Sequence, residues 1–222
     1  LGAYELPSTL PIISDGPVQL DIWPVIKENG VLANSIIYPF YTKMSGTYTF
    51  NPEETTKLDL QTTYRDDLTF EVVEDFEGGH FFTDDVDGDP ATTITITAED
   101  AFEGGSSGRI VLNEDNPYLE AGWKDLFYPE RAELAWVELN YKTNIPFVIG
   151  LRGVKDGMPV GDYNTFINTK NEWNKIYFNF SSLIDPTIFD AAQLVIVAGW
   201  TSILDVEEAE ILIDNVKFIR LK

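Results

Sequence analysis

The sequence predicts an all-β protein in which a β-sandwich follows a small β-module. Short runs rich in Val, Ile, Thr and aromatic residues recur along the chain, separated by turn-forming clusters of Gly, Asn, Asp and Pro. No long segment shows the 3.6-residue period of an amphipathic helix. The 222 residues include no cysteine and 44% are hydrophobic. The fold must therefore rest on an apolar core rather than on disulfides or thiolate-bound metal.

The first 68 residues divide into a leader and a small module. Residues 1–17 are rich in proline and show no sustained period, which predicts an extended tether. Pro24 and Pro39 interrupt two later runs, and proline in a strand belongs at an edge or a bulge because it has no N–H to donate. We expect a small β-module over residues 18–68, with β-prone runs at 18–26, 35–42, 46–50 and 57–64.

The remaining residues, 69–222, have the length of one sandwich. Turn signals such as "DGDP", "EGGSSG" and "VKDGMPVG" separate its candidate strands. The segment 181–193 is expected to form a helical turn or two, limited by Pro186. The predicted strands cover 69–76, 92–98, 108–112, 134–141, 146–153, 175–180, 192–200 and 211–219.

The charge balance limits the partners of the chain. Thirty-seven acidic and fifteen basic residues give a net charge of -22, so nucleic acid and anionic membrane surfaces would be repelled. No apolar run is long enough to span a bilayer. The sequence begins at Leu1 rather than Met, which is typical of a processed or trimmed protein. We expect an export signal, or a lipid-bearing cysteine just upstream, to have been removed.

Catalytic motifs are sparse. His80 is the only histidine, and the sequence contains neither cysteine nor a G-x-S-x-G elbow, so a nucleophilic triad has no support. A carboxylate-based glycoside hydrolase stays a weaker hypothesis, because the many acids single out no pair. The acids of "DDVDGDP" (Asp85, Asp87 and Asp89) could converge on calcium, but the EF-hand spacing fails and an acidic turn is favoured. We expect no enzymatic activity.

An acid near the end of the chain needs compensation. If residues 211–219 form a regular strand, Asp214 shares an apolar face with Leu212, Val216 and Phe218. A carboxylate taken out of water costs several kcal/mol unless it is paired, hydrogen-bonded or bound to metal. The alternatives are a metal site, or a β-bulge or hydrogen-bonded acid beside Asn215.

The segments "EDFEGG" (74–79), "EGGSSGRIVL" (103–112) and "ILIDNVKF" (211–218) resemble the jelly-roll, galactose-binding-like carbohydrate-binding modules, over about residues 69–222. The resemblance extends to surface lipoproteins of glycan-foraging Gram-negative bacteria. It implies a jelly-roll sandwich with a structural calcium held by Glu77 and Asp214, and less securely by Glu103.

Sugar binding requires aromatic platforms surrounded by hydrogen-bonding groups. Trp136 is the leading candidate, because it alternates with Glu138 and Asn140 on one strand face, a mixture typical of an exposed sheet. The remaining candidates lie in loops and at strand ends: Trp123, Tyr128, Arg152 and Trp200.

These observations favour a non-catalytic glycan-binding protein, exported to the bacterial surface and bound to a poly- or oligosaccharide. Its association with the outer membrane would depend on a lipid anchor upstream of the sequence. The alternative is a spacer or protein-protein interaction sandwich without a sugar site. An exposed Trp136 or Trp123 in a groove favours sugar binding, whereas buried tryptophans favour a scaffold.

Overall fold

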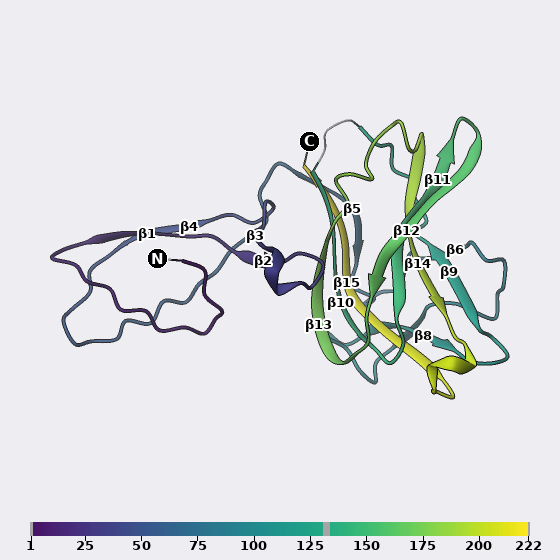
Figure 1. Ribbon diagram of the computed structural model, residues 1–222, viewed down its shortest axis with the longest axis horizontal. Coiled ribbons are helices and arrows are strands. Elements are labelled where there is room, and N and C mark those ends of the chain that lie inside the picture. The colour runs from purple at the N-terminus through teal and green to yellow at the C-terminus, as the bar shows by residue number, and fades with distance from the viewer. Residues whose placement is uncertain (1, 131–133, 222) are drawn as a thin grey trace. The chain divides into compact units, whose positions relative to one another are not determined.

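The computed structural model describes residues 2–130 and 134–221. The chain divides into two compact units, Leu1–Leu68 and Thr69–Lys222, and almost all of its regular structure is strand (Figure 1). Among the described residues, the two helical segments are single 3-10 turns of three residues each, η1 (Leu32–Asn34) and η2 (Ser202–Leu204). Within the described ranges, no helix has the length and apolarity to cross a membrane.

The first unit contains two short antiparallel ladders. β1 (Val18–Ile22) pairs with β4 (Met44–Tyr48), and β2 (Val25–Lys27) pairs with β3 (Ser35–Ile37). Pro24 lies between β1 and β2 and separates them, because it cannot donate to a ladder. The strand expected over 57–64 is absent from the structure. That run forms one β-bridge, between Tyr64 and Tyr41, and its Thr62 and Thr63 form hydrogen bonds with Thr42.

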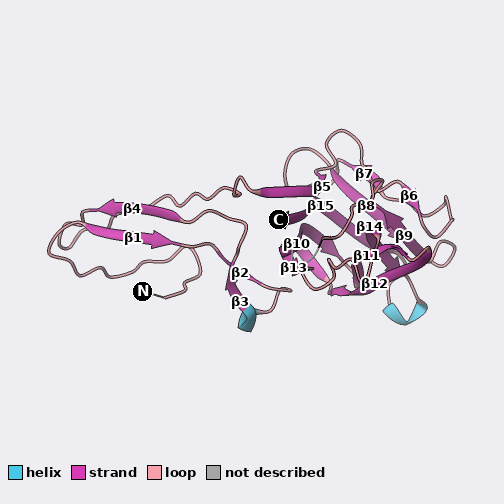
Figure 2. Cartoon of the chain, turned by 90° about the horizontal axis from the view of Figure 1, so that it is seen from above, coloured by secondary structure: helices cyan, strands magenta, loops and turns pink. Residues whose placement is uncertain are grey.

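The second unit is a sandwich of two sheets (Figures 1 and 2). Sheet 1 has the order β13-β10-β15-β8-β7, with β5 also pairing β15, and sheet 2 has the order β12-β11-β14-β9-β6. The strands of sheet 1 are β5 (Leu68–Glu74), β7 (Thr95–Thr97), β8 (Ser107–Leu112), β10 (Leu134–Thr143), β13 (Lys170–Asn179) and β15 (Ala209–Leu221). Those of sheet 2 are β6 (Asp84–Asp85), β9 (Tyr118–Gly122), β11 (Phe147–Lys155), β12 (Met158–Ile167) and β14 (Ala191–Gly199).

The core lies between the two sheets and is built mainly by alternation along the strands. On β10, Ala135, Val137 and Leu139 belong to the core, whereas Trp136 and Glu138 lie on the opposite face. On β14, the even-numbered residues from Ala192 to Ala198 supply the core from the other sheet. The faces that point away from this core are called the outer faces of sheets 1 and 2 below.

A β-bulge in the last strand explains the position of Asp214. Glu138 pairs with Lys217, but Asn140 pairs with Asp214, so β15 has one residue more than β10 over this stretch. Asn215 carries the irregularity in the left-handed conformation, with φ +50°, which asparagine tolerates better than most residues. The strand therefore changes face at Asn215.

The prediction that one strand face carries Leu212, Asp214, Val216 and Phe218 together is consequently wrong. Val216 and Phe218 belong to the core, as does Ile213 before the bulge. Asp214 immediately follows the core residue Ile213 and thus points to the outer side of sheet 1. The extra residue at the bulge separates the acid from the apolar residues that follow it.

Candidate functional site

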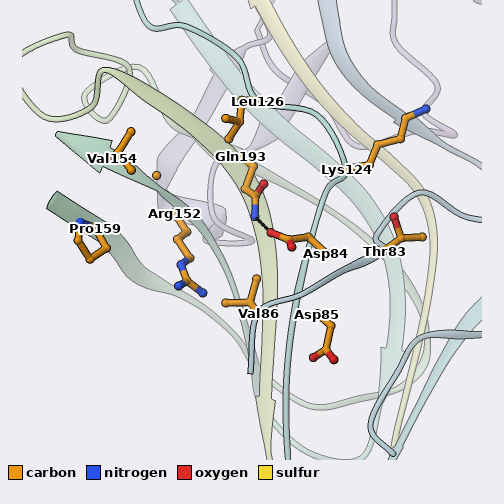
Figure 3. Close-up of a pocket in the computed structure, with 11 residues that line it drawn as sticks. Thr83, Asp84, Asp85, Val86, Lys124, Leu126, Arg152, Val154, Pro159 and Gln193 are labelled. Carbon is orange, nitrogen blue, oxygen red and sulfur yellow. Dashed lines mark hydrogen bonds between the residues drawn. The ribbon is translucent and has the colours of Figure 1, made fainter. Parts of the chain in front are cut away.

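A pocket opens on the outer face of sheet 2, with a volume of about 660 Å³. This size is typical of a small-molecule site. Figure 3 shows Arg152 and Pro159 on one side of the pocket and Lys124 and Thr83 on the other. The lining comes from all five strands of the sheet or from the segments next to them: Thr83, Asp84, Asp85, Val86, Lys124, Leu126, Arg152, Gly153, Val154, Pro159 and Gln193.

A hydrogen bond crosses the floor of the pocket and depends on a glycine. Gln193 on β14 donates through Nε2 to Asp84 Oδ2 on β6, passing over β9, which lies between those strands (Figure 3). The β9 residue beneath is Gly122, and a Cβ there would lie 2.4 Å from Gln193 Nε2. Any larger residue would displace the glutamine. The Gln193–Asp84 hydrogen bond therefore requires glycine at position 122.

A second polar group forms beside the pocket and is called the Glu120 network: Tyr118, Glu120, Arg152 and Tyr163. Tyr163 OH donates to Glu120 Oε1 at 2.8 Å, and Tyr118 OH donates to Oε2 at 3.1 Å. Tyr163 stands on β12 and Glu120 on β9, three strand positions apart, or about 14 Å at the usual strand spacing. Their side chains meet above β11 and β14 and border the pocket on the Arg152 side.

The electrostatics of the network keep its hydroxyls as donors. Burial, reinforced by the Glu120 carboxylate, raises the pKa of Tyr118 and of Tyr163 to about 12. Arg152 Nη1 lies 3.6 Å from Glu120 Oε1, an ion pair too long for a hydrogen bond. No described side chain or carbonyl accepts a hydrogen bond from this guanidinium, so its N–H groups can serve a ligand.

The leading sequence candidates are on the expected strand face but are not accessible. Trp136, Glu138 and Asn140 lie opposite the core residues of β10, and they are only 2%, 0% and 1% exposed. Glu138 forms an ion pair of 3.0 Å with Lys175 on β13. The predicted exposure is wrong because alternation determines which face a residue is on, not whether that face is open.

The remaining candidates are dispersed. Trp123 is 6% exposed and packs edge-on against Phe82 in the core, with ring centroids 5.3 Å apart. Trp200 is half-buried against the core, where its Nε1 donates to Val206 O at 2.9 Å. Tyr128 is 68% exposed, outside the pocket lining. Arg152 alone among the predicted sugar-binding residues lines the pocket.

Asp214 is 1% exposed and is compensated by backbone N–H groups. Its Oδ2 accepts from Phe102 N and Glu103 N, both at 3.1 Å, and its Oδ1 accepts from Asn215 N at 2.7 Å. Burial nonetheless raises the pKa of this carboxyl above 3.8, and the nearby Glu77 charge adds to the shift. The hydrogen-bonded acid and the β-bulge, which were alternatives at the sequence level, occur together.

Glu77 holds the same loop from its other end. Its Oε1 accepts from Gly105 N at 2.8 Å and from Ser106 N at 3.0 Å. Gly104 has φ +71°, and a Cβ there would lie 2.2 Å from the Glu77 carboxylate, so the loop can approach only with glycine. We call this arrangement, in which Asp214 and Glu77 bind the N–H groups of residues 102–106, the amide clamp.

The amide clamp does not fit a calcium ion. Calcium requires converging oxygen ligands, but the atoms directed at Asp214 and Glu77 are N–H groups with partial positive charge, and Glu103 contributes its backbone N–H. In the described part of the chain, no three His, Asp or Glu residues gather as a metal site. The calcium site that the resemblance implies at Glu77, Asp214 and Glu103 stays a prediction, which chelation tests.

The acidic segment before β7 is likewise a set of turns. Asp85 Oδ1 accepts from Gly88 N, and Asp87 Oδ1 accepts from Asp89 N, both at 2.9 Å. Such local bonds from aspartate to the backbone two or three residues ahead are typical of turns. The acidic-turn interpretation accounts for these contacts.

The hydrogen-bonded pair in the pocket, Asp84 and Gln193, was not predicted from the sequence. Asp84 begins the acidic segment "DDVDGDP" but was not singled out within it, and Gln193 interrupts an apolar run. A signal was nevertheless present in the glycines inside predicted or observed strands, Gly122 and Gly153. Glycine within a strand often marks a place where a ligand or another chain segment comes close.

Several solved structures are similar to this chain, although no protein-family model and no curated protein matches its sequence. The C-terminal family 22 carbohydrate-binding module of Clostridium thermocellum Xyn10B is 16% identical, with a TM-score of 0.46 over 68% of this chain and 94% of the module. The xylan-binding domain CBM22-1 of Paenibacillus barcinonensis Xyn10C is 16% identical, with a TM-score of 0.43 over 69% and 96%. A family 30 carbohydrate-binding module is 12% identical, with a TM-score of 0.42 over 57% and 73%. At this level of similarity, neither ligand nor site transfers to this chain.

Proposed function

We propose that the chain is a non-catalytic carbohydrate-binding protein whose ligand occupies the pocket on sheet 2. One observation carries the proposal: the pocket lining combines the Arg152 guanidinium, the Gln193 amide and the Asp85 carboxylate with the apolar side chains of Val86, Leu126, Val154 and Pro159 on an open sheet face. Sugar hydroxyls both donate and accept hydrogen bonds, and the C–H faces of the rings are apolar. A lining that mixes donors, acceptors and small apolar surfaces suits such ligands.

The hydrogen bonds of two carboxylates in and beside the pocket support binding rather than hydrolysis. Asp84 in the lining accepts a hydrogen bond from Gln193, and Glu120 beside the pocket accepts hydrogen bonds from two tyrosines. A glycoside hydrolase needs one carboxyl group to deliver a proton and another to attack or to activate water. Here the two acids orient their neighbours instead.

The proposal includes export to the cell surface, with a lipid anchor upstream of Leu1. The net charge of -22 keeps a protein dispersed in any compartment, so localisation must be decided by experiment. Protease treatment of intact cells tests this part. We expect the chain to be digested while an internal marker protein survives, and digestion only after lysis would contradict it.

A second function is favoured by a different observation. Trp123 and Trp136, the two tryptophans expected to form sugar platforms, are both buried, as in a sandwich that serves as a spacer or binds other proteins. This alternative predicts a folded protein that binds no glycan.

A glycan array separates the two functions. We expect wild type to bind at least one glycan, and Arg152→Ala to lose that binding because the pocket loses its open guanidinium. Arg109→Ala is the matched control, since Arg109 pairs with Glu210 at 2.7 Å on sheet 1, outside the pocket lining. Absence of binding by wild type, or equal binding by Arg152→Ala, would reject the pocket.

A further inference from the structure

The loop over residues 100–106 is fixed more firmly than an ordinary surface loop. The amide clamp binds four of its N–H groups to two carboxylates from elsewhere in the sequence, and Asp214 is nearly inaccessible. Ser107 Oγ adds a hydrogen bond to Asp100 O at 2.6 Å. Hydrogen bonds to charged groups are about twice as strong as neutral ones, so the backbone of this loop is preorganised.

The loop presents an aromatic ring to solvent. Phe102 is 47% exposed, although its backbone N–H is bound to Asp214. Trp173 on β13 lies edge-to-face with it, with ring centroids 6.0 Å apart at 61°. Such a pair gains from its geometry as well as from the apolar area that it buries. Phe102 and Trp173 are called the aromatic pair.

Polar groups anchor the Trp173 ring of the aromatic pair. Trp173 Nε1 donates to Asp100 Oδ1 at 2.7 Å, and Lys142 Nζ donates to Asp100 Oδ2 at 2.6 Å. The Asp100 and Lys142 side chains each remain 35% exposed. A carboxylate oxygen has a second lone pair, and an ammonium group has three donors. Both residues can therefore also bond a ligand that covers the rings.

We propose that the aromatic pair is a second carbohydrate-binding site, which packs against the apolar face of an uncharged pyranose ring while Asp100 and Lys142 bond its hydroxyls. The class of ligand in this proposal rests on the proposed function. The location of the site does not, since none of these residues lines the pocket on sheet 2. The amide clamp supplies the rigidity of the site. A fixed platform loses less conformational entropy when a ligand binds.

Calorimetric titration with xylohexaose, cellohexaose and mannohexaose tests the second site. We expect wild type to bind at least one, and Phe102→Ala and Phe102→Leu to weaken that binding about tenfold, as loss of one aromatic stacking contact implies. Phe102→Leu keeps apolar bulk but removes the ring. Phe166→Ala is the matched control, because Phe166 is 67% exposed on β12 and outside the pocket lining. Its binding should equal that of wild type.

The outcomes separate this inference from the proposed function. Binding that is weakened by both Phe102 variants and retained by Arg152→Ala supports the aromatic pair and rejects the pocket as the site for that sugar. Binding that is lost by Arg152→Ala and unchanged by both Phe102 variants overturns the aromatic pair and leaves the pocket supported. A wild type that binds none of the three hexasaccharides also overturns the aromatic pair.

Discussion

Replacing Asp214 with asparagine should destabilise the sandwich, because an amide cannot reproduce the bonds of the carboxylate. Oδ2 accepts two loop N–H groups and Oδ1 accepts one from Asn215, whereas the asparagine side chain has one acceptor oxygen. At least one N–H loses its partner, at about 1.5–3 kcal/mol for a bond to a charged group. The bonds that remain weaken, and relief of carboxylate desolvation offsets part of the loss.

We therefore expect Asp214→Asn to lower the free energy of unfolding by about 2 kcal/mol. The corresponding fall in Tm is about 4–8 °C for a unit of this size, measured by scanning calorimetry of the full chain. Asp115→Asn is the matched control, because Asp115 is an exposed acid in the turn between β8 and β9. A Tm within 1 °C of wild type, or an equal fall in the control, would refute the role assigned to the amide clamp.

The stability that Asp214 contributes should also depend on pH, in a direction that its pKa determines. The pKa of Asp214 is raised above 3.8 in the folded protein, so between 3.8 and that higher value the folded state binds more protons than the unfolded state. Stability contributed by Asp214 therefore falls as pH rises through this window. The difference in stability between wild type and Asp214→Asn should be larger at the acidic end of the window than at neutral pH.

Three further predictions follow from the geometry. A calcium chelator should leave Tm unchanged, and a lowered Tm that added calcium restores would contradict the amide clamp. The pKa values of Tyr118 and Tyr163, measured by tyrosinate absorbance, should be about 12. Glu120→Gln should lower both pKa values, and unchanged pKa values in that variant would exclude the Glu120 network. Gly153→Ala should lower the free energy of unfolding by about 1–3 kcal/mol, because the added Cβ would lie 1.9 Å from the carbonyl oxygen of Ala191. Gly78→Ala is the control in thermal denaturation and should leave stability unchanged, because a Cβ there meets nothing within 4 Å.

The fold class followed from local signals, and the errors lie where one residue changes the local geometry. The sequence predicts a turn over the whole of residues 154–161, but the turn consists of Asp156 and Gly157, both with positive φ, and β12 begins at Met158. Two residues of this kind suffice for a tight hairpin. Likewise, the left-handed Asn215 reversed the expected face of the strand that follows it.

The candidate site was less predictable, because it depends on contacts between strands far apart in sequence. The Gln193–Asp84 and Tyr163–Glu120 bonds join residues 109 and 43 positions apart. Alternation identified Trp136 as lying away from the core, but its burial depends on tertiary packing. Composition alone carries no information about these long-range contacts or about the burial of Trp136.

The most direct test of the central claim is a ¹⁵N-correlated NMR titration of wild type with the glycan that binds best on the array. Our account predicts that the side-chain resonances of Gln193 Nε2 and Arg152 Nε shift with saturation, because both groups line the pocket. Arg109 Nε, bonded to Glu210 on sheet 1, should not move. A bound glycan that leaves both pocket resonances unshifted would contradict the account.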